Sequence, residues 1–173
     1  MRLKFLGASQ NVTGSRFLLE NENHRILIDC GLFQERALRF RNWEDFPVPP
    51  SSIDAVILTH AHLDHCGYLP KFVKEGFKGN IFCTPPTMEI AQIALLDSAK
   101  LQEEDAIFKK KRHQREGRKG PYPEIPLYTI EETQKVFPHF VTLPYHREFQ
   151  ITTDIKVTFY DAGHILGAGI VVV

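Results

Sequence analysis

The sequence has no excess of charge of either sign and no long hydrophobic run. Its 173 residues contain 21 lysines and arginines and 21 aspartates and glutamates, so the formal net charge is zero. A protein that attracts nucleic acid over its whole surface is therefore excluded, and any polyanion has to bind at a local patch. No segment reaches the roughly 20 apolar residues of a membrane span, and the N-terminal segment lacks a signal-peptide hydrophobic region. We expect a cytoplasmic protein without a membrane partner.

Cysteine is scarce as well. Cys30, Cys66 and Cys83 cannot all pair with one another, and each lies in or beside an apolar segment. We expect buried free thiols in a reducing compartment. The 43% of hydrophobic and 24% of charged residues are typical of a soluble globular protein, and the length suffices for one domain with a core. Residues 1–173 are therefore expected to form one unit.

Histidine is concentrated in one place, directly after a predicted strand. Residues 55–58 are uniformly apolar, which favours a buried strand. Four candidate metal ligands follow within six residues: His60, His62, Asp64 and His65. Neutral imidazole suits zinc, and a carboxylate added to imidazoles is typical of a catalytic site with an open position. A strand end that is rich in histidine by chance is the alternative, and so dense a cluster makes it the weaker interpretation.

The spacing of these ligands predicts how they are arranged. His60 and His62 are two residues apart, so their side chains share a face only where the backbone stays extended. A zinc pair on a helix would need a spacing of four residues. Asp64 and His65 are adjacent and must diverge in a turn, which Gly67 permits. We expect two histidines to point at one metal and the Asp64–His65 pair at a second one nearby.

The segment THAHLDHCG, residues 59–67, resembles the signature of the metallo-β-lactamase superfamily. Four further segments agree with it: residues 7–15, 26–34, 97–105 and 161–168. Together they resemble the β-CASP branch, the RNA-processing group related to the endonuclease of mRNA 3′-end cleavage. The resemblance covers essentially the whole chain. It implies an α/β protein with the αββα sandwich of that superfamily, of which residues 1–173 would be the incomplete N-terminal half.

The resemblance also implies an activity, the zinc-dependent hydrolysis of phosphodiester bonds in RNA, and a site with two zinc ions. His164, in a turn that leaves a predicted strand, would join His60 and His62 on the first zinc. Asp64 and His65 would bind the second and serve as catalytic residues, with Asp64 orienting the attacking water. Asp29, at the end of another predicted strand, is either a turn residue or, as the resemblance favours, a buried carboxylate that fixes the metal-site loop.

Some elements of the family pattern do not occur between Met1 and Val173. These are an aspartate in a Ser-Gly-Asp context that bridges the metals, the β-CASP insertion and a late histidine ligand. We therefore expect the N-terminal portion of a longer enzyme or a truncated product, with the second zinc site weak or empty in this chain. Alternatives are a hydrolase of a thioester, a lactone or DNA, and a non-catalytic RNA-binding paralogue. A homodimer is compatible with the sequence, which does not define the oligomeric state.

A long helix is predicted from about Thr87 onward, because apolar residues recur roughly every three to four positions. It ends in a basic block at residues 109–119, with seven cations in eleven positions. Five of them are candidate RNA contacts that would neutralise backbone phosphates: Lys109, Lys110, Lys111, Arg112 and Arg115. The alternative is a solvated helix end with cations favoured by the helix dipole. Both interpretations stay open, since no aromatic residue is interleaved for base stacking.

The remaining pattern describes strands interleaved with helices and no internal repeat. Residues 7–15 are expected to connect two strands and not to cradle phosphate, because they lack the lysine and the following helix of a P-loop. A capping box at Thr129 and Glu132 predicts the start of a further helix. Four other histidines lack ligand spacing and are expected to be structural or solvated: His24, His113, His139 and His146.

Overall fold

Nine strands form two sheets in the computed structural model, which describes all residues from Met1 to Val173. The first sheet has the strand order β1–β2–β3–β4–β5–β6 and the second the order β7–β8–β9. The strands are β1 (Arg2–Phe5), β2 (Phe17–Glu20), β3 (Arg25–Ile28), β4 (Ala55–Ile57), β5 (Asn80–Cys83), β6 (Phe140–Thr142), β7 (Glu148–Gln150), β8 (Lys156–Asp161) and β9 (Gly169–Val172).

Strand direction changes in the middle of the first sheet. The first three strands pair antiparallel, and β2 and β3 form a hairpin. From β3 to β6 the pairing is parallel, so a crossover connection is required between each pair of strands, and the crossovers after β4 are helical. The crossovers contain α1 (Leu63–Cys66), α2 (Leu69–Lys74), α3 (Pro85–Glu116) and α4 (Ile130–Gln134). The carboxyl ends of β3 and β4 therefore meet at one edge of the sheet, where Asp29 and the histidine cluster follow.

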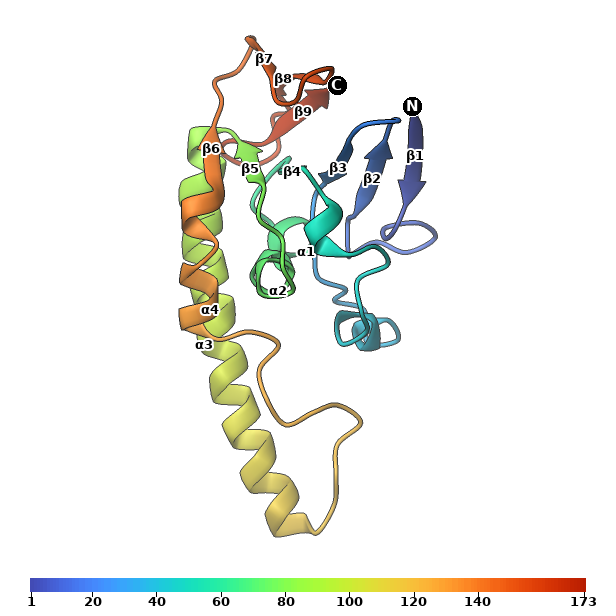
Figure 1. The fold of residues 1–173 in the computed structure, drawn as a ribbon. Coiled ribbons are helices and arrows are strands. Elements are labelled where there is room, and N and C mark those ends of the chain that lie inside the picture. Colours follow the sequence, from blue (N-terminus) through green and yellow to red (C-terminus); the bar gives the residue numbers. More distant parts are fainter.

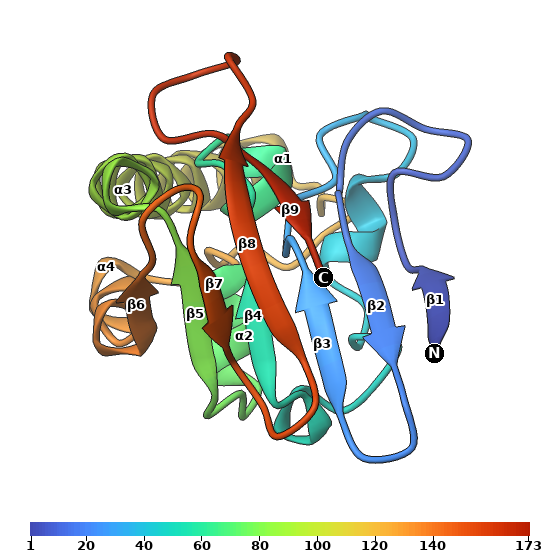
Figure 2. The same ribbon diagram turned by 90° about the horizontal axis from the view of Figure 1, so that it is seen from above.

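The central strands of the first sheet are covered on both faces, as Figure 2 shows, whereas β1 at the edge is largely exposed. Leu18, Leu27 and Val56 belong to the core on the helical side. Their neighbours Ile26 and Ile57 belong to a second core, which includes buried residues of β8. This alternation explains the uniformly apolar β4, because both of its faces are buried. Helices, first sheet and second sheet are thus stacked in three layers, and the predicted α/β fold class is confirmed.

The helix α3 begins slightly earlier and reaches much farther than its neighbours. It starts at Pro85, two residues before the predicted Thr87, because proline is well tolerated in a first turn that has no hydrogen bonds to lose. It ends at Gly117, whose φ of +63° closes the helix. Its second half projects beyond the sheets, and residues 117–129 return along it (Figure 1). The predicted capping box of Thr129 and Glu132 is present at the start of α4.

The structure also describes the cysteines and the helices. Cys30, Cys66 and Cys83 are all buried and unpaired. None of the helices combines the length and the apolar character needed to cross a membrane.

Candidate metal centre

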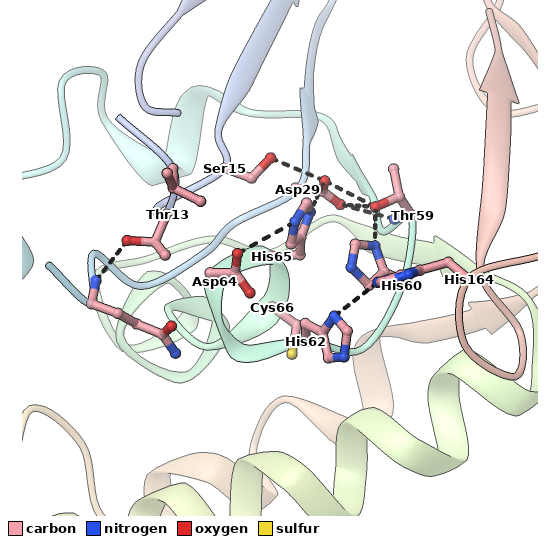
Figure 3. A network of polar contacts seen from close by, with 12 residues as sticks. Thr13, Ser15, Asp29, Thr59, His60, His62, Asp64, His65, Cys66 and His164 are labelled. Carbon is pink, nitrogen blue, oxygen red and sulfur yellow. Dashed lines mark hydrogen bonds and ion pairs between the residues drawn. The ribbon is translucent and has the colours of Figure 1, made fainter. Parts of the chain in front are cut away.

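The histidine cluster lies at the carboxyl edge of the first sheet and takes residues from two sheets (Figure 3). His60 and His62 follow β4, and the backbone at His62 is extended, with φ −68° and ψ 144°, as their spacing requires. The short helix α1 then carries Asp64 and His65. His164 comes from the loop between β8 and β9 in the second sheet. The structure thus brings together five residues that are predicted to bind metal.

Three of the histidines converge on one point. Nitrogen atoms of His60, His62 and His164 lie within 4.8 Å of one another, and His164 Nε2 is 3.2 Å from His62 Nδ1. Two nitrogens on one tetrahedral zinc lie about 3.4 Å apart, given zinc–nitrogen bonds of about 2.1 Å. Burial, together with the neighbouring His65, lowers the pKa of His60 to about 4, so its imidazole is neutral at pH 7. These donors fit one zinc ion, and three protein ligands leave a fourth position open.

The carboxylate of Asp29 is the centre of the hydrogen-bond network behind the histidines. Its side chain is buried, and it accepts hydrogen bonds from the backbone N–H and the hydroxyl of Thr59 at 2.9 Å each. It also accepts from the Ser15 hydroxyl at 3.2 Å and from His65 Nδ1 at 2.7 Å. Asp29 adopts a left-handed backbone conformation, with φ +58°, which aspartate tolerates better than most residues. The buried charge is therefore satisfied on both oxygens.

His65 is oriented by this network toward Asp64. Because Nδ1 is bonded to Asp29, the other ring nitrogen, Nε2, faces Asp64 Oδ2 at 3.6 Å. Burial acts to lower the pKa of His65, but the hydrogen bond and charge of Asp29 and the charge of Asp64 together raise it above its ordinary value. The ring lies 3.9 Å from that of His60 between centroids. The Asp64–His65 pair is thus adjacent to the three converging nitrogens and contributes no atom to their cluster.

Close backbone packing holds α1 in place. The Ser15 N–H donates to Asp64 O at 2.8 Å, and the Cys30 N–H donates to His65 O at 2.7 Å. Between them, Gly31 approaches so closely that an added Cβ would lie 1.6 Å from Asp64 O. The buried Arg16 donates to Gly31 O at 2.9 Å and packs under aromatic rings. Residues 7–15 connect two strands, as predicted, and they also support the helix that carries Asp64 and His65.

Glu35 fixes the conformation of residues 7–15. Its carboxylate accepts hydrogen bonds from the backbone N–H groups of Val12 and Thr13 at 2.8 and 3.0 Å, and from the Thr13 hydroxyl. The hydrogen bonds from Thr13 lower the pKa of Glu35 to about 2. The carboxylate therefore stays ionised at all but strongly acidic pH.

The loop of His164 is attached to the N-terminus of α3 and to β4. The hydroxyls of Thr84 and Thr87 donate to Gly167 O at 2.6 and 2.8 Å. The Gly169 N–H donates to Thr59 O at 2.9 Å. Sequence reasoning missed these contacts and the roles of Ser15 and Thr59. Only Thr59 had a local signal, since it directly precedes the histidine cluster.

The basic block lies away from this centre, on the projecting end of α3 (Figure 1). Lys109 pairs with Asp105 at 2.5 Å, and Arg112 Nε is 4.0 Å from Glu116. Both side chains line a cavity beneath the returning loop. The other candidate RNA contacts are exposed and do not line that cavity: Lys110, Lys111 and Arg115. The structure brings none of the five to the histidine cluster.

The histidines that lack ligand spacing are dispersed over the molecule. His113 is buried, and its Nδ1 lies 2.5 Å from Glu124. His139 Nδ1 donates to the backbone oxygen of Gly79 at 2.8 Å. His24 lies 2.9 Å from the Thr153 hydroxyl, and His146 is exposed.

Known proteins resemble this chain in sequence, and others resemble it in fold. The sequence profile of the metallo-beta-lactamase superfamily domain matches residues 18–173. The chain is 38% identical over 172 residues to transcription termination factor FttA of Methanosarcina mazei, and 34% identical over 172 residues to ribonuclease TTHA0252 of Thermus thermophilus. These alignments cover 98% and 99% of this chain but 24% and 35% of the relatives. The chain thus spans a quarter to a third of their length.

A solved structure shows the same fold at lower sequence identity. The Rm3 metallo-beta-lactamase superposes with a TM-score of 0.52 and 16% identity, covering 96% of this chain and 51% of that chain. At such identity the likeness concerns the fold alone.

Proposed function

Because the chain belongs to the metallo-beta-lactamase superfamily, we propose that it provides the metal centre of a zinc-dependent nuclease that cleaves phosphodiester bonds in RNA. The observation that carries this proposal is the convergence of nitrogen atoms from His60, His62 and His164 within 4.8 Å. The substrate class is proposed from relatives named as a ribonuclease and a transcription termination factor. Since the chain spans only part of those relatives, the activity is proposed for a longer protein in which residues 1–173 form the N-terminal part of the domain.

The residues around the centre have separate tasks in this mechanism. When bound, zinc supplies Lewis acidity toward a phosphoryl oxygen and makes water a better nucleophile at neutral pH. His60 remains neutral because it is buried, so its lone pair is available at pH 7. Asp64 is partly exposed and accepts the proton of the attacking water, which it also orients. His65, fixed by Asp29, keeps its Nε2 directed at Asp64.

We propose Asp64 and His65 as ligands of a second zinc ion. Two protein ligands make a weak site, because structural and catalytic zinc sites use three or four. The chain of 173 residues should therefore bind one zinc ion tightly and a second one weakly. Asp29 is proposed as the carboxylate that sets the tautomer and orientation of His65, a role that strengthens metal binding.

The three thiols of the chain are buried and take no part in this chemistry. Burial raises the pKa of Cys30 and of Cys83 to about 12, and it raises the pKa of Cys66 as well. Such thiols stay protonated and unreactive, and none of them forms a disulfide. We propose the cytoplasm as the compartment and RNA as the partner, since relatives of the chain are named as a ribonuclease and a transcription termination factor.

The test is cleavage of labelled RNA by the longer protein and by its His62→Ala and Asp64→Ala variants, together with zinc content by mass spectrometry. Both variants should lose nearly all cleavage, and His62→Ala should also lose bound zinc. The control is His146→Ala, which removes an exposed histidine outside the centre and should change neither quantity. Undiminished cleavage in His62→Ala would refute the mechanism. A 2′-deoxy substrate that is cut as well as its ribo counterpart would refute the assignment to RNA.

A further inference from the structure

A cavity of about 460 Å³ lies beneath the loop that follows α3, outside the metal centre. Its walls come from the second half of α3, from the returning loop at residues 117–127 and from the segment at residues 32–43. Small-molecule sites in proteins have volumes of about 300–1,000 Å³, so the space suits a ligand the size of a nucleotide. We call it the α3 cavity.

Two aromatic side chains lie at this cavity. Trp43 and Tyr122 have nearly parallel rings, with an angle of 13° between the planes and 6.5 Å between the centroids. Both line the cavity and are only partly buried, so ring surface is accessible. Aromatic rings bind nucleobases by stacking, with little preference for the base. The aromatic side chains that residues 109–119 lack are thus supplied by other segments of the chain, which line the same cavity.

Positive charge is arranged around the same space. Arg39 donates its Nε to the backbone oxygen of Gln34, so no carboxylate is bound at that atom. Arg112 Nε is buried and has no hydrogen-bond partner, and Glu116 lies 4.0 Å from it. A buried donor without a protein partner is unfavourable unless a water molecule or a ligand supplies an acceptor. Both arginines line the cavity.

The acidic groups at the cavity are already paired. Asp105 binds Lys109 at 2.5 Å. Glu124 lies 2.5 Å from Nδ1 of the buried His113. The charge of Asp105 is therefore offset locally, and cations outnumber carboxylates in the lining, so a phosphate near Arg39 and Arg112 meets a positive environment.

We propose that the α3 cavity binds one nucleotide of single-stranded RNA, with the base against Trp43 and Tyr122 and the phosphate at Arg39 and Arg112. This inference rests on the proposed function, since it assigns a second contact to the same substrate. Leu32 lines the cavity, and its backbone N–H donates to Leu63 O in α1 at 3.0 Å. Leu63 is one residue before Asp64, so the lining of the cavity contacts the helix that carries Asp64 and His65. A single-stranded RNA bound in the α3 cavity would therefore be anchored beside α1, the helix that carries the proposed catalytic residues.

The chain offers a direct measurement of binding, because Trp43 is its one tryptophan. The metal-free chain, kept in chelator, is titrated with adenosine 5′-monophosphate while tryptophan fluorescence is recorded. We expect a saturable change, with weaker binding of adenosine and of inorganic phosphate, which each supply half of the contacts. A short oligoadenylate should bind more tightly and be displaced by the mononucleotide. No saturable change with the mononucleotide or the oligonucleotide would overturn the proposal.

Matched variants locate the site. Tyr122→Ala should weaken binding about tenfold by loss of stacking, whereas Tyr122→Phe should retain it. Arg112→Gln should weaken binding of the nucleotide but not of adenosine. Lys110→Gln removes a cation from the same helix outside the cavity and should have no effect. Equal affinities for Tyr122→Ala and the parent chain, or equal losses in Lys110→Gln and Arg112→Gln, would refute the site.

The result is separable from the proposed catalysis. Binding is measured without metal and can be repeated in His62→Ala, which should bind the nucleotide like the parent chain. Loss of cleavage with intact nucleotide binding concerns the metal centre alone. Intact cleavage without nucleotide binding would refute the α3 cavity as an RNA-binding site and leave the proposed metal centre unaffected. Circular dichroism of each variant separates lost binding from lost folding, and Tyr122→Phe and Arg112→Gln carry the test if Tyr122→Ala does not fold.

Discussion

The metal centre and the projecting end of α3 differ in how their charged groups are surrounded: the central carboxylate of the first is buried and hydrogen-bonded, and the groups of the second are mostly exposed. At the centre the carboxylate of Asp29 is buried and receives hydrogen bonds on both oxygens from three different segments. At residues 101–119 the charges lie mostly at the surface and pair along one helix, as Lys109 does with Asp105. The centre is thus built for one geometry, whereas the projecting end can change its contacts at little cost. Five measurements test this comparison.

The largest difference should come from two glycines. Gly31→Ala places a Cβ 1.6 Å from Asp64 O, so the backbone must move, and we expect a loss of about 3 kcal/mol or more in the free energy of unfolding. Gly117→Ala, at φ +63° and with no atom within 4 Å of the new Cβ, should cost about 1 kcal/mol for the left-handed conformation alone. Urea unfolding of both variants measures the two values. Equal losses would mean that the packing around α1 is no more rigid than that at the end of α3.

The second effect concerns the orientation of His65. Asp29→Asn keeps the size of the side chain but removes the charge that pairs with Nδ1 of His65, so the affinity for the second, weaker zinc ion proposed on Asp64 and His65 should fall about 10- to 100-fold. Asp105→Asn is the matched change at the projecting end and should leave zinc affinity unchanged. A competition titration with a chromophoric chelator gives both numbers. An unchanged affinity in Asp29→Asn would remove this carboxylate from the proposed site.

The third measurement compares two glutamates with lowered pKa values. Hydrogen bonds from Thr13 set the pKa of Glu35 to about 2, whereas Glu116 owes its lowered pKa to the hydrogen bond and charge of the exposed Arg118. Carboxyl NMR titration in 0.05 M and 1 M salt should show a value near 2 for Glu35 in both, and a value for Glu116 that rises with salt. A rise for Glu35 of the same size would indicate a screened surface interaction instead.

The same shift has a consequence for stability. Because the pKa of Glu35 is lowered on folding, its ionised form stabilises the protein above the ordinary value of 4.5. That contribution is lost as the pH falls from 4.5 toward 2. The difference in stability between the parent chain and Glu35→Gln should therefore be constant at neutral pH and shrink over that range.

The smallest effect belongs to the surface pairs of α3. Lys109→Gln removes the exposed pair with Asp105 and should lower stability by about 0.3–0.5 kcal/mol at low salt. In 1 M salt the difference should vanish. Thermal unfolding at both salt concentrations checks this. A loss above about 1 kcal/mol that persists in salt would place Lys109 in a tightly held network like that of Asp29.

Local sequence determined those parts of the fold that depend on neighbouring residues. The uniformly apolar residues 55–58 gave a buried strand, and Thr129 with Glu132 gave a helix start. The start of α3 was displaced because the two prolines before Thr87 belong to the helix. The positions of His60, His62 and His164 are those that their predicted grouping requires, while their role as ligands remains a prediction.

Contacts between distant segments could not be predicted in the same way. The Ser15 hydroxyl reaches Asp29 only because two loops pack together, and neither residue carries a local signal for this. Trp43 and Tyr122 meet because the loop after α3 folds back, which the prolines of residues 121–126 make irregular without fixing its path. For the same reason the sequence showed the basic block but not which of its side chains line the cavity.

The three converging histidines follow strands of different sheets, so a bound metal ion would link the two sheets. His60 and His62 lie in the loop that follows β4 of the first sheet, whereas His164 lies in the loop between β8 and β9 of the second. An ion held by all three would act as a cross-link between the layers, and its affinity would include the work of holding them together. At one hundred times its dissociation constant, such an ion adds about 2.7 kcal/mol to the stability of the docked arrangement. The stability of the packing between the two sheets would then rise with the concentration of free metal.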